Sequence, residues 1–182
     1  GGSVKSEPFL IFMEEGSNIP KYITANLKGE AQIQSLDFTD EKVVVNFLNK
    51  NKKKSQIVVR EFSFSGKVLN TEQIQNTEKY EFLSVKYFQN TTQRLLLGNY
   101  GFGSTNLDGI KSSQGIFVVD LNKANKIKYY SFENFKNIFG FLTDKQQERL
   151  RKQVEKKKDK SNEFIFNYRL TINEVIPDGD NL

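Results

Sequence analysis

Hydrophobic and polar residues alternate along most of the first 130 residues, and turn residues divide the alternating runs. A period of two is typical of β-strands with one buried face. Phe9–Glu15 and Tyr22–Leu27 are separated by a segment that contains Gly16 and Pro20, which predicts a hairpin. The same pattern predicts further strands at Ile33–Phe38, Val43–Leu48, Gln56–Phe64, Ser84–Phe88, Arg94–Leu97 and Gln114–Leu121.

The strand pattern occurs twice. Ser84–Phe88 matches the pattern of Ser35–Phe38, and Gln114–Leu121 matches that of Gln56–Phe62. Four-stranded antiparallel units repeated at about 40 to 60 residues are typical of propeller blades, but a propeller needs about four blades to close. We therefore expect a mainly β fold of antiparallel strand repeats, either propeller-like or forming an open twisted sheet.

The pattern becomes helical after residue 130. Ser131 is a suitable N-cap for a short helix whose apolar residues are spaced three and four apart as far as Leu142. Thr143-Asp144-Lys145-Gln146 has the form of a capping box and opens a longer helix to about Lys160. A two-helix insertion is therefore predicted near 131–160.

These elements predict one domain over 1–182, with β-rich repeats at 1–130, the helical insertion at 131–160 and a terminal strand and turn at 161–182. Phe164–Ile176 alternates like a strand and runs into the turn sequence Pro177-Asp178-Gly179. A turn at this point predicts a following partner strand, so we expect the sequence to be a fragment of a longer chain.

Composition indicates a folded domain and excludes several kinds of chemistry. The 182 residues are 37% hydrophobic and 27% charged and include 16 Phe and 7 Tyr, which is too aromatic for intrinsic disorder. The sequence has no Cys and no His. Thiolate or imidazole metal sites, Ser-His-Asp triads and Cys nucleophiles are therefore excluded. Carboxylate, Lys, Tyr or Ser chemistry and simple binding remain, and no catalytic residue, metal or cofactor is assigned.

Positive charge is concentrated rather than spread. The net charge is +5, and residues 143–160 contain eight Lys or Arg against four Asp or Glu. A solvated helix face accounts for this cluster, although such clusters also contact phosphates or anionic lipid headgroups. Another basic run lies at a predicted hairpin tip. The candidate residues for contact with a partner or an anion are Lys52, Lys53, Lys54, Arg151, Lys156, Lys157 and Lys158.

The glycine-rich segment from Gly98 to Thr105 is a candidate ligand-binding loop. It lacks the third Gly of a dinucleotide-binding motif and the Gly-Lys-Ser/Thr of a phosphate-binding loop. A long loop between two strands is the simpler interpretation, and such loops often carry binding residues. The aromatic and polar side chains that would contact a ligand there are Tyr100, Phe102, Ser104, Asn106 and Asp108.

Several segments carry a resemblance to known proteins. Leu95–Tyr100, Ser113–Phe117, Tyr130–Phe135 and Asn167–Leu170 resemble segments of uncharacterised strand-repeat, propeller-like proteins from Bacteroidetes-type bacteria. The resemblance covers about Leu95 to Ile176. It implies a bacterial protein built from strand repeats and supplies no catalytic residue.

The expected function is a non-enzymatic interaction or binding module that recognises a protein or glycan partner. A carboxylate-dependent hydrolase is the first alternative, and binding of nucleic acid or an anionic surface through the basic helix is the second. An extracytoplasmic location, in the periplasm or cell envelope, is favoured over the cytoplasm. No apolar run approaches the roughly 18 residues that a membrane span requires. The oligomeric state does not follow from the sequence.

Overall fold

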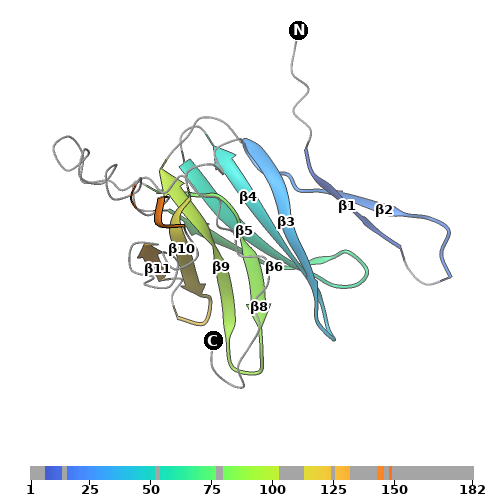
Figure 1. Cartoon of the computed structure of the whole chain (residues 1–182). Helices are drawn as coiled ribbons and strands as arrows, with labels where there is room; N and C mark the ends of the chain where they lie inside the picture. Colours follow the sequence, from blue (N-terminus) through green and yellow to red (C-terminus); the bar gives the residue numbers. More distant parts are fainter. Residues whose placement is uncertain are drawn as a thin grey trace, which may run out of the picture.

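The structure is a computed structural model that describes most of the β-rich part of the chain (Figure 1). The described residues are 7–13, 16–51, 54–76, 80–102, 113–123, 126–131, 143–145 and 148. The predicted two-helix insertion and the terminal strand at 164–176 lie almost entirely outside them and stay predictions. No helix among the described residues is long and apolar enough to cross a bilayer.

Four consecutive strands form the first antiparallel sheet. Their order in space is their order in sequence: β3 (Glu30–Phe38), β4 (Val43–Asn51), β5 (Lys54–Phe62) and β6 (Val68–Gln75). The two central strands contain uninterrupted hydrophobic runs, Val43–Val45 and Ile57–Val59, and every residue of both runs is buried. Because neighbouring residues in a strand point to opposite faces, this sheet must be covered on both sides.

The second antiparallel sheet is centred on β9 (Arg94–Phe102). One side of β9 pairs with β10 (Ser113–Asp120), which pairs in turn with β11 (Ile127–Ser131). The other side is occupied by two short strands that divide the length of β9 between them. These are β7 (Tyr80–Phe82), which pairs with 100–102, and β8 (Lys86–Gln89), which pairs with 94–97.

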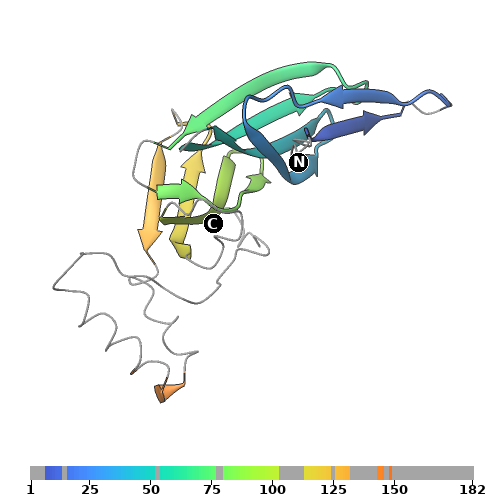
Figure 2. The ribbon, with the colours of Figure 1, turned by 90° about the horizontal axis from the view of Figure 1, so that it is seen from above.

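The two sheets pack face to face around one hydrophobic core, as the layers in Figure 2 show. Hydrogen-bonded contacts also cross between the sheets, two of them from β7. The Phe82 backbone N–H donates to Ser55 Oγ at 2.8 Å, and Lys50 Nζ lies 3.2 Å from Glu81 Oε2. Each sheet contributes buried side chains to this core: Val44, Ile57, Val59 and Ile74 from the first, and Phe82, Tyr87, Leu96, Tyr100, Phe117 and Val119 from the second.

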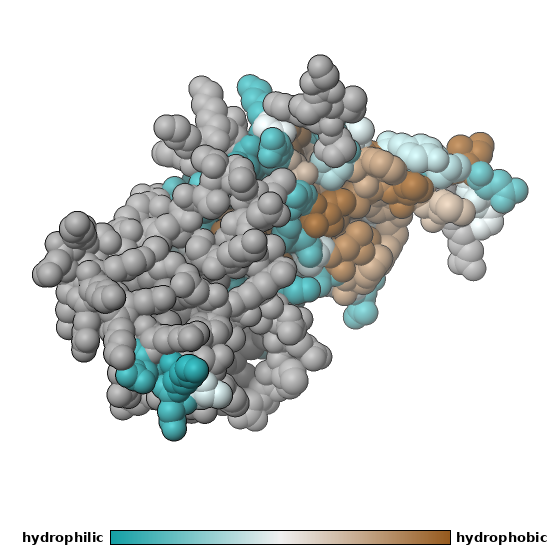
Figure 3. Space-filling view, turned by 45° about the horizontal axis from the view of Figure 1, so that its top comes forward, coloured by the Kyte–Doolittle hydropathy of each residue, from teal (hydrophilic) through white to brown (hydrophobic). Residues whose placement is uncertain are grey.

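A hairpin covers the outer face of the first sheet. Its strands are β1 (Phe9–Phe12) and β2 (Lys21–Thr24), and its inner side packs on Val43, Val45, Phe47, Val58 and Phe62. Arg60 fixes the end of the hairpin because its guanidinium donates a hydrogen bond to the Ala25 carbonyl. Figure 3 shows hydrophobic residues gathered on the side of the molecule that carries the hairpin. The exposed ones on it and its turn are Phe9, Ile11, Met13, Ile19 and Tyr22.

The glycine-rich segment is partly strand, which corrects the expectation of a loop beginning at Gly98. Gly98 pairs with Phe117 inside β9, and the strand continues to Phe102. The glycine is required for a close approach of backbone. A Cβ atom at position 98 would lie 2.0 Å from the Ser84 carbonyl oxygen and 2.7 Å from the Phe117 ring. At this point the segment between β7 and β8 lies directly against β9.

The prediction of a mainly antiparallel β fold is confirmed, and the propeller arrangement is not shown. The two main sheets are stacked over a shared core and neither closes on itself, whereas propeller blades are arranged radially around a channel. Two strands, β7 and β11, were not predicted, and β6 was predicted only at its start, where Val68-Leu69 follows the Ser65-Gly66-Lys67 turn. β6 is largely polar, β7 has three residues and β11 has five, so each carries a weak alternation signal.

Substitution Gly98→Ala tests the close approach at the centre of the second sheet. The added methyl group meets backbone on one side and a buried ring on the other, so we expect a loss of about 3 kcal/mol in the free energy of unfolding. Gly16→Ala is the control, because nothing lies within 4 Å of a Cβ there and only its positive φ of 79° opposes the change. The control should cost about 1 kcal/mol. Equal losses in urea-induced unfolding of the two variants would contradict the packing described.

Candidate functional site

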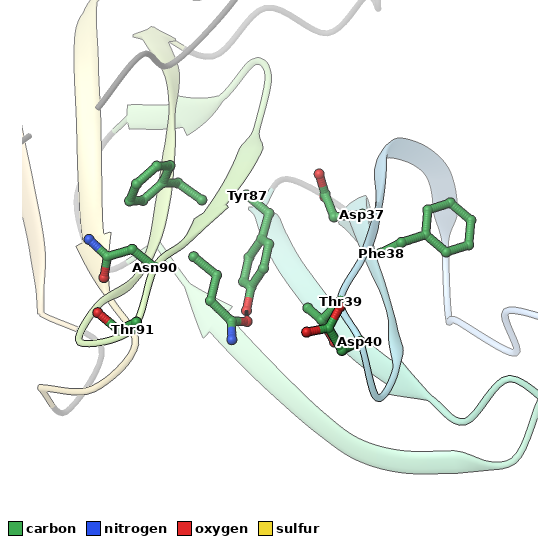
Figure 4. A pocket seen from close by; sticks show the side chains of 9 residues that line it. Asp37, Phe38, Thr39, Asp40, Tyr87, Asn90 and Thr91 are labelled. Carbon is green, nitrogen blue, oxygen red and sulfur yellow. Dashed lines mark hydrogen bonds between the residues drawn. The ribbon is translucent and has the colours of Figure 1, made fainter. Parts of the chain in front are cut away.

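A cleft lies where the edges of the two sheets meet, between β3 and β8 (Figure 4). It has a volume of about 540 Å³. One wall is the end of β3 with the following turn, and the other is β8 with its own turn. The lining residues are Asp37, Phe38, Thr39, Asp40, Tyr87, Phe88, Gln89, Asn90 and Thr91. In Figure 4 the Asp37 and Tyr87 side chains lie on the facing sides of the two strands, whereas the Phe38 ring points away.

Asp37 is the half-buried acid of the β3 wall. Its Oδ2 atom accepts hydrogen bonds from Ser35 Oγ at 2.9 Å and from Asn46 Nδ2 at 3.4 Å. Burial raises the pKa of the Asp37 carboxyl above its ordinary value, although the hydrogen bond from Ser35, the charge of Lys86 and the hydrogen bond from Asn46 act in the opposite direction. The carboxyl is therefore held in place by its neighbours and is more readily protonated than an exposed aspartate.

Tyr87 is the corresponding side chain of the β8 wall. Its ring is 9% exposed and belongs to the core between the sheets. Its hydroxyl donates to Gln89 Oε1 at 2.5 Å and accepts a hydrogen bond from Arg94 Nε at 3.4 Å. The orientation of Tyr87 and Gln89 is therefore tied to a charged group at the start of β9.

Four charged side chains connect the sheets behind this wall. Arg94 Nη2 on β9 lies 2.8 Å from a carboxylate oxygen of both Glu61 and Glu72, on β5 and β6. Lys42, which follows the β3 turn, lies 2.8 Å from Glu61. Partial burial acts to lower the pKa of Arg94, but hydrogen bonds to Tyr87 and Glu72 together with their charges outweigh it and raise that pKa. Arg94 thus remains charged and holds the two sheets at the cleft.

The two turns that border the cleft have matching geometry. The Thr39 backbone N–H donates to the Lys42 carbonyl at 2.9 Å, and the Asn90 N–H donates to the Gln93 carbonyl at 3.0 Å. A side-chain oxygen closes each turn from inside. Thr39 Oγ1 accepts from the backbone N–H of Lys42 at 3.2 Å, and Asn90 Oδ1 accepts from that of Gln93 at 2.7 Å. The turns are therefore ordered before any ligand binds.

The cleft offers both hydrogen-bond donors and hydrogen-bond acceptors, and it carries negative charge. Carboxylates, amides and hydroxyls line it, and none of the nine lining residues is basic. Two of the nine, Asp37 and Asp40, are acids, which disfavours anionic ligands such as phosphates. Among the described residues, no group of three or more acidic side chains is arranged to hold a metal ion. The arrangement is suited to binding a neutral polar molecule rich in hydroxyl groups.

The structure places few of the sequence-predicted site residues. Tyr100 is 3% exposed and packs in a cluster of three rings, with centroids 4.7 Å from Tyr80 and 4.9 Å from Tyr129. Tyr100 therefore packs in the core between the sheets. Phe102 ends β9 and Lys54 begins β5, but their side chains are not described. The remaining candidates lie outside the described residues: Ser104, Asn106, Asp108, Lys52, Lys53, Arg151, Lys156, Lys157 and Lys158.

The residues of the cleft carry little signal in the sequence. Asp37 and Asp40 stand out only as acids near a turn, which is ordinary turn chemistry. A clearer signal is the position of these residues within the two repeated strand patterns. Each of the two repeated strand patterns has a polar turn after its first strand, and these are the turns that meet at the cleft. Recognising that pairing requires the packing of the two sheets, which the alternation pattern does not contain.

Comparisons of the chain with protein-family models, with curated proteins and with solved structures found no significant match. The resemblance to strand-repeat proteins of Bacteroidetes-type bacteria therefore stays a prediction. Any functional argument rests on the geometry of the cleft.

Asp37→Asn tests the environment of this half-buried acid. Because the folded-state pKa is raised, the folded state binds more protons than the unfolded state between the two pKa values, and the ionised carboxyl opposes folding at neutral pH. The variant should therefore be at least as stable as the parent at pH 7, with this advantage disappearing as the pH falls below about 4. Thermal unfolding from pH 3 to 8 measures this difference. A variant that is less stable only at neutral pH would show that the ionised carboxylate is stabilising.

Proposed function

We propose that this protein is a non-enzymatic binding module that takes a carbohydrate in the cleft between β3 and β8. The observation that carries the proposal is that seven polar side chains, from two turns and their strands, line one cleft. These side chains are Asp37, Thr39, Asp40, Tyr87, Gln89, Asn90 and Thr91.

The chemistry of the lining matches that of sugar hydroxyls. Each hydroxyl both donates and accepts a hydrogen bond, so it suits a site with carboxylate acceptors and with amide groups that do both. Gln89 and Asn90 supply amides, and Asp40 supplies an exposed carboxylate. Bonds to a charged acceptor are stronger than neutral ones, which gives Asp40 the largest expected contribution.

Pre-ordered turns favour binding because little conformational entropy is lost when a ligand enters. The hydrogen bonds inside the Thr39 and Asn90 turns supply this order on both sides of the cleft. The Arg94 network adds a fixed wall behind Tyr87. These features support a preformed site rather than one that is assembled by the ligand.

A hydrolase that uses carboxylates is the second candidate function. The observation that favours it is the presence of two acids in one cleft, of which Asp37 has a raised pKa. A general acid paired with an ionised carboxylate is the usual arrangement in glycoside hydrolysis. A binding module would bind the sugar without hydrolysing it, whereas a hydrolase would cleave it.

The test is binding of the purified chain to an immobilised panel of neutral and acidic oligosaccharides, with single-stranded DNA on the same surface. We expect a neutral oligosaccharide to bind. Asp40→Ala should weaken that binding at least tenfold, because loss of a charge-assisted hydrogen bond removes about 1.5 to 3 kcal/mol. Glu30→Ala removes an exposed acid at the other end of β3 and is the matched control, which should bind as the parent does.

The outcomes distinguish the candidate functions. Equal weakening by Asp40→Ala and Glu30→Ala would show that the effect is one of net charge, which contradicts the proposed site. Binding only to acidic sugars or DNA would favour an anion-binding function. Release of reducing sugar by the parent chain, abolished in Asp37→Asn, would establish the hydrolase.

A further inference from the structure

Strand β6 is the outer edge of the first sheet. Its inner side pairs with β5 from Gln56 to Phe62, and no strand pairs with its outer side among the described residues. Only Glu72 and Ile74 in its eight residues are not exposed. Among the described residues, the outer side of β6 therefore has no strand partner, although the Thr71 N–H already donates to Asn70 Oδ1 at 2.8 Å.

Beyond a bulge at its start, where the pairing with β5 skips Leu69, the β6 edge lacks the features that usually prevent edge-to-edge pairing. Such features are lysines, prolines, bulges and very short length. β6 contains no Lys, Arg or Pro, and its pairing with β5 runs without irregularity from Asn70 to Gln75. It thus presents six consecutive residues of regular extended backbone.

Two other outer strands, β3 and β11, carry such protective features. β3 has a bulge between Ile33 and Ser35, and the acids Glu30 and Asp37 lie along it. β11 has only five residues, with the exposed Lys128 near its centre. Two copies that met along either strand would bring like charges together or meet an irregular edge.

We infer that two copies of this chain associate through antiparallel pairing of their β6 strands. A second copy is the partner favoured by charge. The exposed residues of the regular segment are Asn70, Thr71, Gln73 and Gln75, which are neutral and pair with their own kind without repulsion. The one acid, Glu72, is held by Arg94 inside its own molecule.

This association joins two four-stranded sheets into one continuous eight-stranded sheet about a two-fold axis. It leaves the candidate carbohydrate site free, because β3 and β6 are opposite edges of the sheet. The dimer therefore presents two clefts. It does not depend on the proposed function, and each is tested separately.

The experiment is sedimentation velocity of the purified chain from about 1 to 500 μM, compared with the double variant Thr71→Lys/Gln73→Lys. The parent should shift from the 21.0 kDa monomer to a dimer as concentration rises. The lysines place like charges opposite one another in the dimer, so the variant should dissociate with a Kd at least tenfold higher. Gln32→Lys, an exposed position on β3, is the matched control and should behave as the parent does.

Hydrogen exchange provides a second measurement that needs no variant. Amides within residues 68–75 of the parent should exchange more slowly at 500 μM than at 1 μM, while those of β3 should not change. A parent chain that remains monomeric throughout overturns the proposal and leaves the edge for an extended segment of another protein. A dimer that dissociates equally in the parent and in Thr71→Lys/Gln73→Lys, without protection of β6, also overturns it.

Discussion

Burial of the first sheet on both faces is the constraint on which the rest of the structure depends. The central strands β4 and β5 place hydrophobic residues on each side, and the second sheet and the β1–β2 hairpin cover one side each. Neither covering element has a comparable core of its own. The hairpin has two strands, which are rarely stable alone, so its order depends on contact with Val45, Phe47 and Val58.

The cleft is a consequence of how the second sheet packs on the first. Both sheets run their strands in sequence order, β3 to β6 in one and β8 to β11 in the other, with β7 extending the line of β8. The turn after β3 and the turn after β8 therefore occupy equivalent positions in the two sheets. Where the sheets meet at their β3 and β8 edges, the turns face each other, and the charged network of Glu61 and Arg94 fixes their separation. A cleft formed in this way needs no long loop.

The sequence predicts most of this fold and little of the site. Runs such as Val43–Leu48 and Gln114–Leu121 indicate strands because they are short, mostly hydrophobic and bounded by turn residues, and β4 and β10 are found there. Alternation does not report which sheet covers which. For that reason the sequence predicts a loop at Gly98, where the structure has a close backbone contact. It also suggests Tyr100 as a ligand contact, whereas the structure places this residue in the core. The hydrogen bond that Asp37 accepts from Asn46 forms only once β3 and β4 have paired.

The central claim is that the two facing turns form the binding site of the protein. Nuclear magnetic resonance titration of the isotope-labelled chain with a neutral oligosaccharide that it binds tests this most directly, because it reports every amide at once. The account predicts that the largest shifts occur in two separate segments, 37–40 and 87–91, while β6 and β11 change little. Shifts confined to one of these segments, or centred on the hairpin at 9–24, would contradict it.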